Sequence, residues 1–160
     1  MNIIALDIDD SILPSDQNYF GNADDSLKML EINCNRLKVI IDKYDMKIHL
    51  TSSWVTILNL KDNCINFKYK RNFPVEYEQL KIMKKYLDGK FISFTNCGSE
   101  SCRASSIKAL VAEGHKVVVI DDMKLEYLSS DNCMFHYTHG FIDNSIGYKL
   151  KKFLENKELK

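Results

Sequence analysis

The sequence lacks the features that mark membrane and secreted proteins. Its 160 residues contain no apolar run that approaches the ~20 residues a membrane span needs. The first residues carry no basic flank, and acids interrupt their apolar stretch, so we expect no secretory signal peptide. From these two absences we expect a cytoplasmic protein without a membrane partner.

The chain also lacks an excess of charge of either sign. Lysine and arginine together number 22, aspartate and glutamate also number 22, and the formal net charge is zero. Nothing global therefore favours a nucleic-acid-binding protein held by bulk electrostatics. The dense basic cluster KYKR at 68–71 is the local exception. It lies in the least regular region, 62–73, which we expect to be a surface loop or a small insert.

Cysteine pairs with metal-binding or redox spacing are absent. Five cysteines include no CxxC pair. Their odd number, in a chain without an export signal, argues against a disulfide framework, so we expect free thiols. The five are Cys34, Cys64, Cys97, Cys102 and Cys133.

No repeat, low-complexity segment or shift of composition marks a domain boundary. A chain of 160 residues that is 45% hydrophobic is long enough to bury a substantial core without covalent crosslinks. We therefore expect a single domain over 1–160, with room for a small insert at about 61–95.

The sequence does contain an alternation of apolar runs and helical periodicities. The strongest strand signal is KVVVI at 116–120, and the run at 3–8 is apolar on both faces, as in parallel sheets covered by helices. Strands that alternate with helices predict an α/β fold: a three-layer, doubly wound, Rossmann-like parallel sheet with helices on both faces. The other predicted strands are 46–50, 90–95 and 133–137, and the predicted helices are 24–44, 75–87, 103–113 and 145–156, with a hydroxyl-rich helix start at 51–54.

Three of these strands run directly into polar residues. The first runs into DIDDS at 7–11, the second into TS at 51–52, and KVVVI into DD at 121–122. Ligands of open α/β sheets gather at the carboxyl ends of the strands, so we expect these distant segments to form one site.

Carboxylates crowded at strand ends repel one another and destabilise the fold unless a positive charge lies among them. Hard oxygen ligands of this kind are those that Mg²⁺ prefers, together with water and phosphate oxygens. Beside such an ion, one aspartate can attack phosphorus, and a second acid two residues on can protonate the leaving oxygen and then activate water. The acids therefore predict a magnesium site for phosphoryl chemistry.

Together the segments resemble the motifs of the haloacid dehalogenase (HAD) superfamily. DIDDS at 7–11 is similar to its first motif, an apolar strand followed by DxDx[TSV], and IHLT at 48–51 is similar to its second. Lys108, on the helix before KVVVI, stands where the third motif has its lysine, and DD at 121–122 resembles the fourth. The order and the strand context match over 3–122.

The resemblance implies an HAD-like fold and a Mg²⁺-dependent phosphatase. It implies that Asp7 is the nucleophile and a metal ligand, and that Asp9 is the general acid and base and gives its backbone carbonyl to the metal. Asp122 would be the other protein ligand. Asp121 would either bind the ion directly or support those ligands.

The resemblance also implies which residues hold the phosphoryl group. Thr51 and the amide of Ser52 would bind its oxygens at a helix start, which suits an anion. Lys108 would offset the charge of nucleophile and phosphate, and Arg103, five residues earlier, is the alternative for that role. We expect Ser11 to line the substrate site as well.

Two positions depart from the family pattern. Ser11 stands where threonine or valine is more usual, and Asp10 stands where glycine is common. The tight turn after Asp9 must therefore form with a side chain present.

The sequence leaves little room for a cap domain over the site. Between Asp7 and Thr51 the predicted long helix uses about half of the chain, which leaves only a flap at 13–23. An exposed site would admit bulky substrates. The combination of motifs is similar to the small HAD phosphatases associated with nucleic-acid end repair, so we expect a phosphomonoester on a nucleotide or a nucleic-acid end.

Aromatic and basic residues would select such a substrate. Trp54 or Tyr69 would stack on a base, and Lys68, Lys70 and Arg71 would contact backbone phosphates. The alternatives are that Trp54 packs in the core and that the basic run is a solvated loop.

Three other functions compete. One is a phosphatase that acts on another phosphorylated small molecule or on a protein. Another is a signalling module similar to a response-regulator receiver, in which the phosphorylated aspartate ends a mid-chain strand and the acid pair ends the first. Here DxD comes first and the acid pair late. The third is a binding protein that has lost turnover, although no member of the catalytic set is missing.

Overall fold

The computed structural model describes residues 1–14, 23–68 and 73–155. These residues contain a five-stranded sheet with the order β5-β2-β1-β6-β7, and every neighbouring pair in it is parallel. The predicted α/β fold with a parallel sheet is confirmed. The strands are β1 (Asn2–Leu6), β2 (Met46–Thr51), β5 (Phe91–Thr95), β6 (Lys116–Asp121) and β7 (Cys133–Tyr137).

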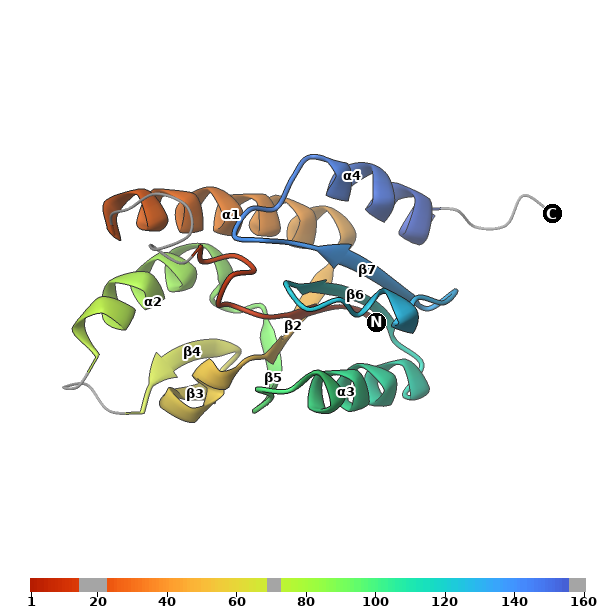
Figure 1. Ribbon diagram of the computed structural model, residues 1–160, viewed down its shortest axis with the longest axis horizontal. Helices are drawn as coiled ribbons and strands as arrows, with labels where there is room; N and C mark the ends of the chain where they lie inside the picture. The colour runs from red at the N-terminus through yellow and green to blue at the C-terminus, as the bar shows by residue number, and fades with distance from the viewer. Residues whose placement is uncertain (15–22, 69–72, 156–160) are drawn as a thin grey trace.

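Helices cover both faces of this sheet, as Figure 1 shows. Helices α1 (Ala23–Tyr44) and α4 (Ser145–Leu150) lie on one side, and α3 (Glu100–Ala112) lies on the other. Helix α2 (Pro74–Leu87) packs against α1. The predicted three layers are therefore present. No helix within the described ranges is both long and apolar enough to cross a membrane.

The central strands are apolar on both faces because both faces are buried. In β1, Ile4 and Leu6 join the core beneath α1, whereas Ile3 and Ala5 join the core beneath α3. This alternation follows from the two-residue period of a strand. It explains why β1 reads as a continuous apolar run rather than as an alternating pattern.

The helices are built by ordinary sequence signals. Leu30, Leu37 and Ile41 of α1 are buried along one stripe, which fits a helix that packs on a sheet. Pro74 opens α2 at a position where its missing N–H costs nothing. Ser99 caps α3 by accepting a hydrogen bond from the N–H of Cys102 at 3.3 Å.

Part of the region that we expected to be irregular, 62–73, is a hairpin instead. Strands β3 (Leu58–Lys61) and β4 (Cys64–Phe67) pair antiparallel. Asp62 and Asn63 join them with φ angles of 52° and 61°, the left-handed pair of a type I′ turn. Of the two expectations for this region, a surface loop or a small insert, the loop is wrong for β4.

Some predicted features differ or lie outside the described residues. The helix start expected at 51–54 is a short 3₁₀ helix, η1 (Ser53–Ile57). The last helix continues beyond α4 as a π-helical turn, η3 (Lys151–Glu155), and its predicted end at 156 is not described. Most of the predicted flap at 13–23 also lies outside the described residues. A further 3₁₀ turn, η2 (Glu126–Leu128), follows β6.

The strand order reverses next to β1. Strands β2 and β5 lie on one side of β1, and β6 and β7 lie on the other. The carboxyl ends of β1, β2 and β6 therefore lie at a topological switch point, the place where open α/β sheets bind their ligands.

Candidate active site

The parallel register places the ends of β1, β2 and β6 at the same level. Leu6 pairs with Leu50 on one side and with Ile120 on the other. Asp7 follows β1 directly, and its backbone N–H donates to the carbonyl of Ile120 at 3.1 Å. The polar residues that follow these positions consequently meet, as the sequence predicts.

Three acids cluster where the strands end. Asp7, Asp121 and Asp122 each offer a carboxylate oxygen, and these oxygens lie within 4.8 Å of one another. Asp7 and Asp121 are buried, and Asp122 is half-buried. Hard divalent cations prefer carboxylate oxygens, so this donor set is suited to one.

A single buried arginine holds the cluster together. One guanidinium nitrogen of Arg103 donates to both oxygens of Asp121 at 2.7 and 2.8 Å, and the other lies 3.1 Å from Oδ1 of Asp7. Asp122 is more distant, with its Oδ1 at 3.9 Å. One guanidinium cannot balance three carboxylates, so the ionised cluster keeps an excess of negative charge that a divalent cation would offset.

Of the two cations expected to offset the charge of the acids, the alternative, Arg103, contacts them, and Lys108 is directed away from them. Arg103 and Lys108 both lie on α3, but Arg103 is buried against the acids and Lys108 is exposed. Five residues along a helix turn the side chain by about 140°, which carries Lys108 off the buried face. Arg103 is in phase with the buried Ile107 and Leu110, and this spacing is a sequence signal that could have selected it.

The surroundings of the acids favour their neutral forms. Burial raises the pKa of Asp7 to about 7, Arg103 opposes this shift, and the neighbouring Asp121 and Asp122 add to it. The hydroxyl of Ser11, which donates to Oδ2 of Asp7 at 3.1 Å, also lowers this pKa. Burial likewise raises the pKa of Asp121. Perturbed carboxyls gathered in one crevice are typical of functional sites.

Thr51, one residue past the Leu6–Leu50 pair, has a hydroxyl without a hydrogen-bond partner among the described residues. The residue is fully buried, and its Oγ1 makes no hydrogen bond within the described part of the chain. An unsatisfied buried hydroxyl destabilises a protein, so a ligand oxygen that accepts from it would be favourable. Next to it, Ser52 is also buried, and its Oγ accepts from the N–H of Trp54 at 3.2 Å.

The second acid of the first motif has a separate partner. The indole N–H of Trp54 donates to Oδ1 of Asp9 at 3.1 Å, a contact that the sequence did not indicate. Partial burial raises the pKa of Asp9, and the Trp54 hydrogen bond opposes the shift. The Trp54 ring itself is 7% exposed and belongs to the core, as the packing alternative predicted.

With this geometry described, the chain was compared with known proteins. No family model, no curated protein and no solved structure matches it. A parallel sheet with polar residues at its switch point occurs in several α/β superfamilies, so the fold alone does not select a function. The chemistry must be argued from the site.

The loop that carries Asp9 turns sharply, as the sequence required. Asp10 has a φ of 55°, in the left-handed region where glycine is favoured and aspartate is tolerated. Its N–H donates to the carbonyl of Leu13 at 2.8 Å, and its carbonyl accepts from the N–H of Gly140 at 2.6 Å. The departure from the family pattern at Asp10 is thus compatible with the turn.

Two residues that the sequence did not single out fix this loop. Asn33 of α1 is fully buried, and its amide N–H groups donate to the carbonyls of Ile12 at 2.7 Å and Gly140 at 2.9 Å. Gly140 has a φ of +80°, and a Cβ there would lie 2.7 Å from Cβ of Pro14. An asparagine on the apolar stripe of a predicted helix is the signal that could have revealed this contact.

The expectation of free thiols is wrong for two of the five cysteines. Cys97 and Cys102 form a disulfide, with their Cα atoms 5.5 Å apart. The bridge closes the loop before α3, and Nε of Arg103 donates to the carbonyl of Cys97 at 3.3 Å. The crosslink therefore supports the arginine that holds the acid cluster. Cys34, Cys64 and Cys133 are free.

Proposed function

We propose that this chain is a Mg²⁺-dependent phosphomonoester hydrolase of the HAD type, with Asp7 as its nucleophile. One observation carries the proposal: at a single switch point, Asp7 meets the acid pair at 121–122 and the guanidinium of Arg103. Thr51, one residue past the Leu6–Leu50 pair, adds a buried hydroxyl that has no hydrogen-bond partner among the described residues. Nucleophile, cation ligands and phosphoryl-binding groups are thereby supplied together. The motif order of the sequence supports the same assignment.

The donor set fits a magnesium ion. Asp121 accepts three hydrogen bonds, two from Arg103 and one from the N–H of Met123, whereas Asp7 has two polar contacts, one with Arg103 and one with Ser11. We therefore assign Asp7 and Asp122 as the ligands and Asp121 as their support. The backbone carbonyl of Asp9 completes the set that the HAD resemblance implies. When bound, the ion would neutralise charge on the nucleophile and on the transferred phosphoryl group.

Side chains of the site supply the groups needed for both steps of phosphomonoester hydrolysis, the formation of an aspartyl-phosphate and its cleavage by water. In the first, an oxygen of Asp7 attacks phosphorus, the bond to the leaving oxygen breaks, and the carboxyl of Asp9 gives that oxygen its proton. In the second, Asp9 takes a proton from water, whose oxygen attacks the phosphorus, and phosphate leaves as Asp7 is regenerated. The raised pKa of Asp9 supports the acid role because it keeps the proton available nearer neutral pH.

Three neighbours position the reacting groups. Ser11 orients Asp7 through the hydrogen bond to Oδ2, and Arg103 holds Oδ1. The hydroxyl of Thr51 is available to a phosphoryl oxygen. Donors that are fixed before the reaction stabilise developing charge without reorganising, and this favours the transition state.

The proposed substrates are those that the sequence indicates, nucleotides or nucleic-acid ends. Of the basic run, Lys68 is exposed directly after β4, whereas Tyr69, Lys70 and Arg71 lie outside the described residues. The buried ring of Trp54 does not offer a free face for stacking. The acid cluster therefore supports a phosphomonoester as the substrate, and it does not select the group to which the phosphate is attached.

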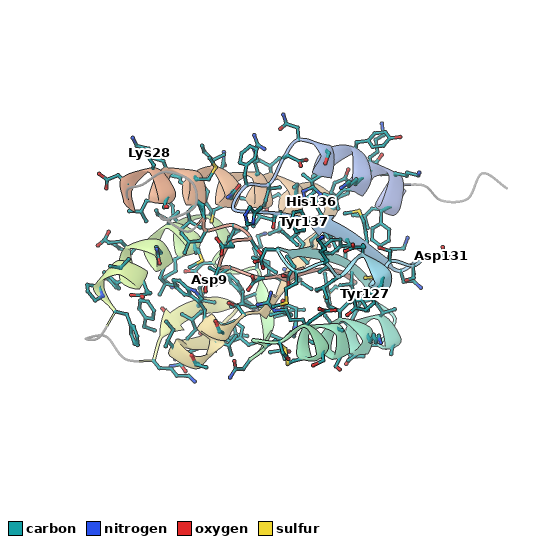
Figure 2. All side chains as sticks on the ribbon, in the orientation of Figure 1. Asp9, Lys28, Tyr127, Asp131, His136 and Tyr137 are labelled. Atoms are coloured by element: carbon teal, nitrogen blue, oxygen red, sulfur yellow. A yellow bond between two sulfur atoms is a disulfide. The ribbon has the colours of Figure 1, made fainter. Side chains whose placement is uncertain are left out.

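A phosphate-release assay tests the function. Purified protein is given an aryl phosphate, nucleoside monophosphates and terminally phosphorylated oligonucleotides, each with Mg²⁺ or with a chelator. We expect Mg²⁺-dependent release by the wild type and loss of it in Asp7→Asn. The control is Asp131→Asn, an exposed acid at the opposite end of the molecule from Asp9 (Figure 2). Turnover retained by Asp7→Asn would show that the nucleophile is elsewhere.

A receiver-like signalling module is the second candidate, and the strand ends count against it. Its phosphorylated aspartate would end a mid-chain strand, but β2 and β5 end in Thr51 and Thr95. Asp7 instead follows the first strand. The same assay separates the two, because a receiver does not turn over repeatedly on aryl phosphates.

A further inference from the structure

The disulfide between Cys97 and Cys102 lies next to the arginine that holds the acid cluster. Arg103 directly follows Cys102 in α3, and its Nε donates to the carbonyl of Cys97 at 3.3 Å. The two terminal nitrogens of the same guanidinium contact Asp7 and Asp121. The bridge, the arginine and two of the acids therefore form one connected unit.

The bridge fixes a short loop at the surface. Asn96, Gly98 and Ser99 are exposed, whereas the side chain of Cys97 is fully buried. Gly98, which has open space around its Cα, gives the backbone rotational freedom directly after Cys97. Opening the S–S bond would release that freedom, so the carbonyl that accepts from Arg103 would be held less firmly.

This bridge is poorly placed to stabilise the fold as a whole. Its cysteines are only 5 positions apart. In the chain-entropy account, crosslinks that close short loops restrict the unfolded chain less than those that close long ones. Its effect should therefore be concentrated at the loop and at Arg103.

The bridged and the free cysteines differ in reactivity. A thiolate is the form that attacks a disulfide. Burial raises the pKa of Cys34 to about 12 and that of Cys133 to about 11, so these thiols do not compete near neutral pH. Cys102 is half-buried in the first turn of α3, where the helix dipole stabilises a released thiolate. An external thiol therefore reaches the bridge at Cys102.

We propose that Cys97 and Cys102 form a reversible exchange site for dithiols, and that its state controls how firmly Arg103 holds the acid cluster. A thiolate of the dithiol attacks Sγ of Cys102, the S–S bond breaks, and Sγ of Cys97 leaves and takes a proton. The second thiol of the reductant then attacks the mixed disulfide, which releases Cys102 and leaves the reductant oxidised. Only the effect on turnover rests on the proposed phosphatase function.

Alkylation and mass spectrometry test the exchange. The folded protein is incubated with dithiothreitol and then denatured in excess N-ethylmaleimide. Three cysteines should carry the label before treatment and all five after it, with Cys97 and Cys102 as the two that change. A bridge that dithiothreitol opens only after urea has unfolded the protein would overturn the proposal.

The release of phosphate from an aryl phosphate measures the consequence, because both redox states come from one folded sample. Reduction should lower kcat/KM by about 3- to 10-fold, as expected when a hydrogen bond to a charged group is loosened, and reoxidation should restore it. Cys102→Ser should match the reduced protein and not respond to dithiothreitol. Cys64→Ser is the matched control, because Cys64 is a free, half-buried thiol in β4, and it should respond as the wild type does.

A second variant distinguishes control of the guanidinium from general support of the fold. Arg103→Lys has no Nε–H to donate to the carbonyl of Cys97, so reduction should change its kcat/KM less than about two-fold. A bridge that only supports the fold would lower the activity of the wild type and of Arg103→Lys by the same factor, and that result would overturn the proposal.

Magnesium binding separates the redox control from the phosphatase function. Arg103 and a divalent cation compete for the same carboxylates, so reduction should tighten Mg²⁺ binding by about 3-fold or more in calorimetry. If no ester is hydrolysed but reduction changes the Mg²⁺ affinity, the redox control stands and the hydrolase function fails. If esters are hydrolysed but neither turnover nor affinity responds to reduction, the redox control fails alone. If no ester is hydrolysed and the affinity does not respond, both fail.

Discussion

Replacing Asp7 with asparagine should stabilise the metal-free protein. The pKa of Asp7 rises from 3.8 to about 7, and each pKa unit corresponds to about 1.4 kcal/mol. Ionised Asp7 therefore costs the fold at most about 4 kcal/mol at pH 8. Asp7→Asn removes this charge, but it also weakens the interaction between position 7 and Arg103. We expect that loss to destabilise the fold by about 1–2 kcal/mol. The net gain should be about 2–3 kcal/mol.

The pH dependence gives this prediction its sign. Between about pH 4 and pH 7 the folded protein keeps the proton on Asp7 while the unfolded chain has released it, so stability falls as the pH rises. Asp7→Asn lacks this contribution, and its advantage should be absent near pH 4 and complete above pH 7. Added Mg²⁺ should stabilise the wild type more than the variant, because the ion binds the charged carboxylate.

Thermal and urea unfolding at pH 4, 6 and 8, with chelator, measure the difference. At pH 8 a gain of about 2–3 kcal/mol corresponds to a Tm increase of roughly 4–12 °C in a protein of this size. Asp131→Asn, at an exposed acid, should change little. If Asp7→Asn is less stable than the wild type at pH 8, or if the difference does not depend on pH, the view of the cluster as mutually repelling acids is wrong.

Three further substitutions, two of them with a control substitution, test other parts of the site. Arg103→Lys loses the guanidinium fork and should lower kcat/KM by about 10- to 100-fold, whereas Lys108→Ala should change it less than about two-fold in the same assay. Gly140 has a φ of +80° and lies against Pro14, so Gly140→Ala should lower the free energy of unfolding by about 2–4 kcal/mol. The control is Gly147→Ala in α4, where the added methyl group has open space, and it should raise the free energy of unfolding by about 0.5–1 kcal/mol. Urea unfolding measures both changes. Trp54→Phe removes the hydrogen bond to Asp9, so the pKa of Asp9 should rise. If Asp9 is the proposed general acid, the corresponding limb of the kcat–pH profile should move to higher pH by up to about one unit, and an unmoved profile would contradict that assignment.

Much of the architecture could be predicted because each signal was local. The apolar runs that became β1 and β6 end abruptly in acids, and this marks both the strand and the edge at which the site lies. The hairpin at 58–67 was missed because its strands are only four residues each and polar residues interrupt them. Its turn pair, Asp62-Asn63, was nevertheless a readable signal.

The parts of the site that could not be predicted depend on contacts between distant elements. The partner of Asp9 is an indole more than forty positions away, and no periodicity specifies that contact. The choice between Arg103 and Lys108, by contrast, could have been made from the sequence, because Arg103 is in phase with Ile107 and Leu110 on the same helix. The disulfide depends on the path of an irregular loop, and cysteine spacing does not encode that path.

The Cys97–Cys102 bridge has a consequence for the motion of α3. Helix ends ordinarily fray, because their first N–H groups lack partners within the helix. Here the crosslink ties the first turn of α3 to the chain segment whose carbonyl receives the side chain of Arg103. The crosslink therefore restrains fraying at the helix end that carries Arg103, and it keeps the guanidinium close to its carbonyl acceptor.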